Sequence, residues 1–171
     1  INKTYYLNLG VSFNKKKIFE YLNRKKIFPT EIKEENFIFI PVLLDQTSND
    51  ILVYSKNPIY DRWIYKNNKS FLINYVLPTE DLEDLNLIRK NYLDIENYDF
   101  KKIIEKYFLE NSIVAIFFKN EKEIKILSKI NIKNETVIKS NSFNDIDFNN
   151  KGEVDELIND LKIVYEDFWK E

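Results

Sequence analysis

Two uninterrupted apolar runs constrain the fold of this 171-residue chain more than any other feature. Residues 37–44 read FIFIPVLL and residues 112–118 read SIVAIFF. Strands with one solvent-exposed face alternate apolar and polar side chains, so continuous apolar runs are typical of strands covered on both faces. Pro41 has no backbone N–H to donate, which indicates a bulge or a strand-edge position within the first run. The sequence therefore predicts a central sheet with helices on either side.

The rest of the chain predicts helices interspersed among further strands. Apolar residues alternate in some segments and recur at helical spacing in others, and Pro, Asn and Thr mark the boundaries. No internal repeat or linker is visible. We therefore expect one α/β domain over residues 1–171, with a single mixed sheet and helices packed on both faces. The predicted strands are 3–13, 37–44, 51–54, 71–77, 112–118, 124–132 and 136–142, and the predicted helices are 15–28, 57–65, one capped by Thr79, 99–109 and 153–169.

The composition excludes several classes of active site. The chain contains no histidine and no cysteine, and its two glycines are Gly10 and Gly152. It therefore cannot hold a Ser-His-Asp or Cys-His triad, a cysteine–histidine zinc site or a glycine-rich phosphate loop. Hydrophobic residues make up 44% of the chain, which is enough for a folded core. We expect no cofactor.

Charge is unevenly distributed along the chain, although the net charge is only −2. The net charge is +4 over residues 1–35, −4 over 80–111, +3 over 112–140 and −6 over 145–171. Neither basic stretch is dense, so we interpret both as solvated faces and expect no nucleic-acid partner. No apolar run reaches the ~18 residues of a membrane span, so we expect no transmembrane segment. The aromatic residues that could stack on bases or sugars are more typical of a core: Tyr5, Tyr6, Tyr54, Tyr60, Trp63 and Tyr65.

The densest polar cluster is acidic and spans residues 80–84, where Asp81 and Asp84 would share one helix face. One interpretation is a divalent-cation site, because hard cations prefer carboxylate oxygens. The other is structural: Thr79 caps a helix, the acids offset its dipole, and Leu82 and Leu85 turn inward. We favour the structural interpretation.

A second candidate is Glu123-Ile124-Lys125, which has the E-x-K form that many metal-dependent nucleases carry on a strand. Asp81 could serve as the upstream acid. The same alternation is typical of any half-exposed strand. We therefore predict no catalytic or metal site, and keep as the alternative a divalent-metal-dependent hydrolase or nuclease that uses Asp81, Asp84 and Glu123.

Residues 72–85, LINYVLPTEDLEDL, combine a short strand, an X-Pro break and an acidic helix start. This segment resembles the "lplvvPlgDleDla" stretch of an uncharacterised proteobacterial family, a domain of unknown function in envelope proteins. Other pieces are similar in the same order: residues 6–22, 37–42 and 107–117, with Lys106 where the family has Arg. Asn57, Pro58 and Trp63 match an "npW…W" segment in which the first Trp is Ile59 here, and Phe168-Trp169-Lys170 matches its closing "W-K" helix.

This resemblance implies a mixed α/β domain of the bacterial envelope, similar in fold to the α/β domains of periplasmic assembly proteins. It implies export to the periplasm with a leader removed, which agrees with the absence of methionine. It supplies no activity and no catalytic residues. We therefore expect a non-enzymatic module that binds a protein partner or supports an assembly in the envelope, with its oligomeric state open.

Overall fold

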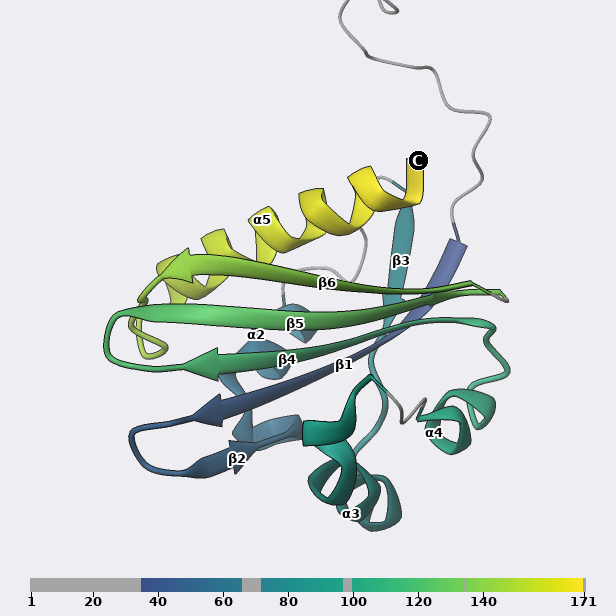
Figure 1. Cartoon of the computed structure of the whole chain (residues 1–171), viewed down its shortest axis with the longest axis horizontal. Coiled ribbons are helices and arrows are strands. Elements are labelled where there is room, and N and C mark those ends of the chain that lie inside the picture. Colours follow the sequence, from purple (N-terminus) through teal and green to yellow (C-terminus); the bar gives the residue numbers. More distant parts are fainter. Residues whose placement is uncertain (1–34, 66–71, 97–99, 134, 171) are drawn as a thin grey trace, which may run out of the picture. The chain divides into compact units, whose positions relative to one another are not determined.

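The computed structural model describes residues 35–65, 72–96, 100–133 and 135–170 (Figure 1). The chain divides into two units, residues 1–33 and 34–171, and every described element belongs to the second. The predicted strand at 3–13 and the helix that follows it lie outside the described residues. The prediction of one domain over residues 1–171 therefore stays a prediction, and the description below concerns the second unit.

The described elements follow the predicted order of strands and helices, with two short 3-10 turns added. They are β1 Glu35–Asp45, β2 Asp50–Leu52, η1 Tyr54–Lys56, α2 Pro58–Tyr65, β3 Ile73–Val76, α3 Leu82–Asn91, η2 Tyr92–Asp94, α4 Lys101–Glu105, β4 Asn111–Lys119, β5 Glu123–Ile132, β6 Glu135–Asn144 and α5 Lys151–Lys170.

The strands form one mixed sheet in the order β2-β1-β4-β5-β6, with β3 also paired to β1. β1 runs parallel to β3 and β4, whereas the β1–β2, β4–β5 and β5–β6 pairs are antiparallel. Parallel pairs need crossover connections, and the chain builds them from α2, α3 and α4. The predicted single mixed sheet is confirmed.

β1 lies inside the sheet, and Pro41 sits at the one gap in its pairing. One flank of β1 pairs with β4 along its length, while the other pairs with β3 up to Ile38 and with β2 from Leu43. The Pro41 carbonyl accepts a hydrogen bond from Asn57 Nδ2 at 3.1 Å instead of from a strand. A proline is tolerated here because no neighbouring strand needs its missing N–H.

Helices cover both faces of the sheet, as the apolar runs predict (Figure 1). On one face, α3 and α4 pack over β1 and β4 through Ile88, Ile103 and Ile104. On the other, α2 and α5 cover Phe39 of β1: the Trp63 ring centroid lies 4.1 Å from that of Phe39, and the Tyr165 centroid 6.2 Å. This double cover explains why residues 37–44 are buried throughout.

The inner strand and the last helix pack as the sequence predicts. Residues 113–117 of β4 are fully buried. α5 docks through Val154, Ile158 and Leu161, all fully buried, and Phe168 is partly buried. Trp63 anchors α2 as expected.

Two helix boundaries differ from the prediction. The helix after β3 starts later than expected, because its N-cap is Asp81 and not Thr79. As a result Leu82 is 80% exposed instead of turned inward, and Leu85 is only partly buried. α4 is shorter than the predicted 99–109: it begins after Phe100, which adopts a left-handed φ of 50°, and it ends at Glu105.

Candidate functional site

The acidic segment after β3 forms a helix start with one buried carboxylate. Asp81 Oδ1 accepts hydrogen bonds from the backbone N–H groups of Glu83, at 2.7 Å, and Asp84, at 3.3 Å. These bonds, together with nearby Lys106, hold the pKa of Asp81 below its usual range. Asp84 lies one turn further on and is only 1% exposed. The four acids are therefore not equivalent: one caps the helix and one is in the core.

Lys106, which follows α4, pairs with three of these acids. Its Nζ lies 2.5 Å from Asp84 Oδ1, 3.7 Å from Asp81 Oδ2 and 4.0 Å from Glu83 Oε2. The hydrogen bond to Asp84 is the largest cause of the raised pKa of Lys106. Buried carboxylates need a paired cation, and here the protein supplies its own. The cluster therefore joins α3 to α4 by an internal ion pair.

Tyrosine hydroxyls surround the same corner of the fold. Tyr60 Oη donates to the Pro78 carbonyl at 2.6 Å, and Tyr107 Oη accepts from the Thr79 backbone N–H at 2.6 Å. Tyr54 Oη is buried and finds no hydrogen-bond partner among the described residues. Burial, reinforced by the charge of Asp84, raises the pKa of Tyr54. All three side chains pack against the core beneath α3 and α4.

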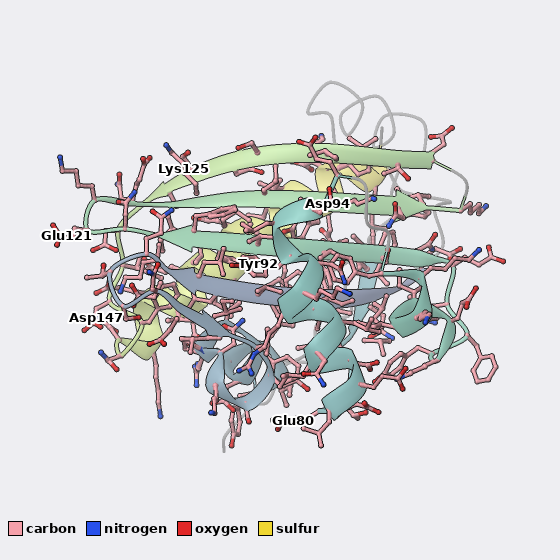
Figure 2. All side chains as sticks on the ribbon, turned by 60° about the horizontal axis from the view of Figure 1, so that its bottom comes forward. Glu80, Tyr92, Asp94, Glu121, Lys125 and Asp147 are labelled. Atoms are coloured by element: carbon pink, nitrogen blue, oxygen red, sulfur yellow. The ribbon has the colours of Figure 1, made fainter. Side chains whose placement is uncertain are left out.

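Glu123 lies in a different part of the molecule, at the start of β5. Its carboxylate pairs with Lys125 Nζ at 3.0 Å, two residues along the same strand. Figure 2 shows the turn before β5, marked by Glu121, well away from Glu80 at the start of α3. Within the described ranges no three His, Cys, Asp or Glu side chains are grouped to hold a metal ion. The structure thus brings Asp81 and Asp84 together but does not bring Glu123 to them.

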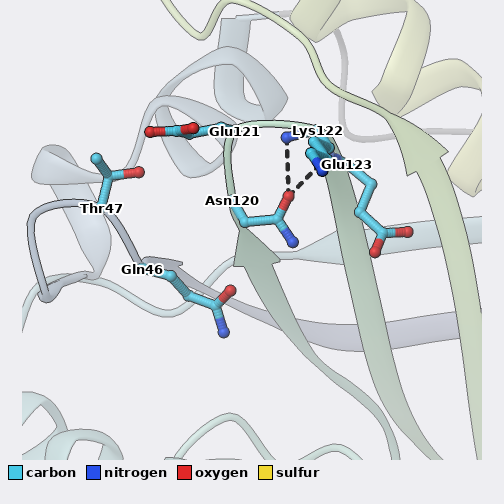
Figure 3. Close-up of a pocket in the computed structure, with 6 residues that line it drawn as sticks. All are labelled: Gln46, Thr47, Asn120, Glu121, Lys122 and Glu123. Carbon is cyan, nitrogen blue, oxygen red and sulfur yellow. Dashed lines mark hydrogen bonds between the residues drawn. The ribbon is translucent and has the colours of Figure 1, made fainter.

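A shallow pocket of about 370 Å³ lies beside this turn (Figure 3). Gln46, Thr47 and Asn120 line it together with residues 121–123. Asn120 Oδ1 is used within the turn, where it accepts from the backbone N–H groups of Lys122 at 2.8 Å and Glu123 at 3.0 Å. The pocket is open and polar side chains from two turns line it, without a grouping suited to catalysis.

The aromatic residues weighed as base-stacking candidates are mostly core residues. Tyr54, Tyr60 and Trp63 are buried, while Tyr65 is exposed. Tyr5 and Tyr6 lie outside the described residues. The three buried rings cannot stack on a nucleic acid without unfolding the core.

The strongest candidate for a binding surface is the edge strand β6. It runs from Glu135 to Asn144 at one end of the sheet order and, among the described elements, pairs only with β5. The β5–β6 register is continuous from Ile132–Glu135 to Glu123–Asn144, without a bulge. In an antiparallel ladder alternate residues direct their N–H and C=O groups away from the paired strand. The outer side of β6 thus offers a row of main-chain donors and acceptors.

The two faces of β6 have different surroundings. Val137, Lys139, Asn141 and Phe143 face α5 and are partly buried, and Lys139 Nζ lies 4.4 Å from the centroid of the Phe168 ring. The other side chains of β6 face the α3–α4 side of the sheet and are exposed: Thr136, Ile138, Ser140, Ser142 and Asn144. The sequence predicted strands at 124–132 and 136–142, and these are β5 and β6. The place of β6 at the sheet edge depends on long-range pairing, which periodicity does not report.

Comparisons with known proteins leave the family of this chain open. No family model and no curated protein matches it. The C-terminal domain of LpoB from Salmonella enterica aligns with a TM-score of 0.39 and 7% identity, over 74% of this chain and 93% of that one. Lipoprotein GNA1162 from Neisseria meningitidis aligns with a TM-score of 0.41 and 10% identity, over 77% and 96%. Both TM-scores lie below 0.5, so neither similarity says what this chain does.

Proposed function

We propose that this chain is a non-enzymatic, protein-binding module of the bacterial envelope, and that an extended segment of its partner pairs with β6. The envelope assignment is supported by the resemblance of residues 72–85 to a family of envelope proteins. No helix among the described residues is long and apolar enough to cross a membrane. The protein-binding assignment is supported by the geometry of β6.

The outer main-chain edge of β6, which pairs with no described strand, carries this proposal. A row of N–H and C=O groups repeating every second residue is complementary to another polypeptide backbone, and strand addition is a recurring mode of peptide recognition. Nucleic acids and small metabolites do not present donors and acceptors with this period. β6 is ten residues long, against three for β2 and four for β3, which flank β1 at the opposite edge.

β6 carries one of the features that normally keep an edge strand from pairing, the inward-facing Lys139, and lacks the others. Proteins shield such edges with prolines, bulges, very short strands or inward-pointing charges. β6 contains no proline and no bulge, and its charged residues are Glu135, at its first position, and Lys139, over Phe168. A strand of this length that no other described element pairs on its outer side is either an aggregation hazard or a binding edge.

We do not propose the metal-dependent hydrolase. Lys106 Nζ lies 2.5 Å from Asp84 and 3.7 Å from Asp81, so an ammonium group already occupies the position that a cation would take between them. Glu123 is paired with Lys125 elsewhere. The residues that the alternative requires are engaged in structural ion pairs.

Photo-crosslinking from the edge strand tests the protein-binding proposal. A photoreactive residue at the exposed positions Ser140 or Ser142 should crosslink one protein in the native host, whereas the same residue at exposed Lys102 on α4 should not. The captured protein, once purified, should bind the full chain directly. Equal crosslinking from all three positions, or no direct binding, would contradict the proposal.

Proline substitutions at two neighbouring positions provide the matched control. One of Ser140 and Asn141 directs its N–H outward, and the other donates toward β5. Proline at the position whose N–H points outward should leave the melting temperature unchanged, because an edge proline is tolerated where its N–H would face solvent. The same variant should no longer bind the partner. Proline at the position whose N–H donates toward β5 should lower the melting temperature. Partner binding that persists in the stable proline variant would show that the partner does not pair with β6.

Protease protection tests the envelope assignment separately. The product of the complete natural gene should be degraded when protease is added to cells whose outer membrane has been opened. Persistence of the protein until the inner membrane is lysed would place it in the cytoplasm and contradict this assignment.

A further inference from the structure

We infer that the protein segment that pairs with β6 carries an uncharged hydrogen-bonding side chain, Asn, Gln, Ser or Thr, directly opposite Asn141. This inference rests on the proposed function and names the chemistry of its partner. It comes from a polar atom of the edge strand itself, which accepts no hydrogen bond within the described part of the chain.

Asn141 holds a buried acceptor that no described residue pairs. Its side chain lies on the α5 side of β6 and is partly buried. Its Oδ1 is shielded from solvent and accepts no hydrogen bond from the residues that the structure describes. The residue paired with it on β5 is Ile126, which is fully buried and has no polar side-chain atom. Buried polar atoms are nearly always paired, so this exception marks a place where a binding partner can supply the missing hydrogen bond.

The outer side of β6 is the side from which a partner can reach Asn141. Among the described elements, β5 alone pairs with β6. An antiparallel strand added to the outer side places one residue directly opposite Asn141, with the two Cβ atoms about 4.5–5.5 Å apart. Side chains at this separation hydrogen-bond across strands. This placement follows from the ladder alone, because Asn141 belongs to the strand that pairs.

Strand addition also removes water from the exposed part of the Asn141 carboxamide. Rotation about the Cβ–Cγ bond can turn the oxygen toward the added strand, and this costs Oδ1 no hydrogen bond because it accepts none from the described residues. Whichever carboxamide group then faces the partner, oxygen or NH2, needs a hydrogen bond in place of water. Hydroxyls and amides both donate and accept, so they pair with either group. An apolar side chain opposite Asn141 would leave the carboxamide unpaired and weaken the complex.

The surroundings of Asn141 disfavour a charged residue opposite it. Its neighbours on the same side of β6 are Lys139 and Phe143. Lys139, whose Nζ lies 4.4 Å from the centroid of the Phe168 ring, repels a Lys or Arg side chain on the added strand. A carboxylate would lose its hydration beside Phe143 and Ile126 without gaining a cation directly opposite. An uncharged polar side chain avoids both costs.

The other side of the strand also suits an uncharged segment. Ser140, Ser142 and Asn144 are exposed there and carry hydroxyl or amide groups. Residues 140–144, SNSFN, contain no charged side chain on either side of the strand. Hydroxyl pairs across strands stabilise a sheet. The expected partner segment therefore carries no charge opposite residues 140–144.

Four synthetic peptides test this inference against the full chain. Each is about ten residues long, matching β6, and alternates Ala with Thr, Val, Glu or Lys. Thr and Val have nearly the same shape and differ in one hydroxyl, so this pair isolates the hydrogen bond. In fluorescence anisotropy the Thr peptide should bind about fivefold more tightly than the Val peptide, which is the effect of one net hydrogen bond. The Glu and Lys peptides should bind more weakly than the Thr peptide.

Variants of β6 locate the source of the preference. Asn141→Leu and Asn141→Val remove the amide, so each should abolish the Thr-over-Val preference and leave the melting temperature unchanged or higher. Asn141→Thr restores a hydrogen-bonding group and should retain the preference. The control on the other side of the strand, Ser140→Ala with Ser142→Ala, should retain it too. A preference that both apolar variants keep, or that the control loses, would overturn the inference.

The remaining outcomes separate this inference from the proposed function. Similar affinities of the Thr and Val peptides, or tightest binding of the Glu or Lys peptide, would overturn the uncharged partner and leave the binding edge intact. Binding of the Thr peptide to the stable proline variant of β6, or no binding of any peptide, would overturn both. A dimer in sedimentation velocity that the stable proline variant abolishes would make a second copy of this chain the occupant and overturn the inference.

Discussion

A single lysine explains how the acidic segment after β3 can bury one of its carboxylates. Lys106 brings its ammonium group to three carboxylates, and the nearest, on Asp84, is almost completely buried. Helical spacing suggested that Asp81 and Asp84 share a helix face, but it did not reveal that Asp84 would enter the core. The cation that makes this possible comes from a separate element, 22 residues along the chain. Long-range pairing of this kind is not encoded in local spacing.

Asp84→Asn should destabilise the protein by about 1.5–3 kcal/mol, because it removes a charged hydrogen bond from a buried site. This replaces the smaller cost, under about 1 kcal/mol, that an exposed acid near a helix start would have. Glu83→Gln is the control, because Glu83 is 70% exposed and 4.0 Å from the same ammonium. Urea unfolding measures both changes. A stabilised Asp84→Asn variant would instead indicate carboxylates held together for a ligand.

Tyr54→Phe should leave stability unchanged or raise it, because its buried hydroxyl has no partner among the described residues. Tyr60→Phe should cost about 1 kcal/mol, because it loses the hydrogen bond to the Pro78 carbonyl. Thermal unfolding of the two variants, side by side, checks this contrast. A clear loss of stability in Tyr54→Phe would show that its hydroxyl is bonded, for example to a buried water.

Asp81 should contribute to stability in a pH-dependent way. Its pKa is lowered in the folded state from an ordinary value of 3.8, so its contribution is present above that pH and is lost as the pH falls through the lowered value. Asp81→Asn keeps a good N-cap but does not titrate. The difference in unfolding free energy between wild type and Asp81→Asn should therefore shrink on acidification below pH 3.8. A difference that stays constant with pH would contradict this role.

At the scale of elements, α5 completes one face of the sheet. Its buried residues Val154, Ile158, Leu161 and Tyr165 recur at helical spacing, which is why the sequence identified the helix. The boundary of α3 was harder to predict, since Thr79 and Asp81 are both good caps. The structure uses Asp81 as the cap, while Thr79 bonds to Tyr107. Competition between two suitable caps was decided by a tertiary contact.

Ending the chain at Asn150 should abolish cooperative unfolding. Removal of α5 exposes the aromatic cluster around Phe39 and Trp63 to water, and burial of such side chains contributes most of a domain's stability. Differential scanning calorimetry of the truncated and full chains tests this. A truncated protein that melts as sharply as the full one would show that α5 is not part of the cooperative core.

For the whole molecule, local pattern was enough to predict the sheet class but not the strand order. The apolar runs at 37–44 and 112–118 indicated covered central strands, and these became β1 and β4. That β6 lies at the edge follows only from the complete set of pairings. The proposed binding edge was missed for the same reason: half-exposed strands look alike in sequence whether a neighbour covers their outer side or not.

The most direct test of this account is amide hydrogen exchange along residues 135–144 in the full chain, measured by NMR. An open edge predicts alternation, with the amides that donate to β5 protected and those between them exchanging rapidly. Addition of the partner protein captured by crosslinking should protect the rapid set and leave the other set unchanged. Protection of every β6 amide in the free chain, or an outer set that the captured protein does not protect, would contradict the claim that β6 is an open edge for a protein partner.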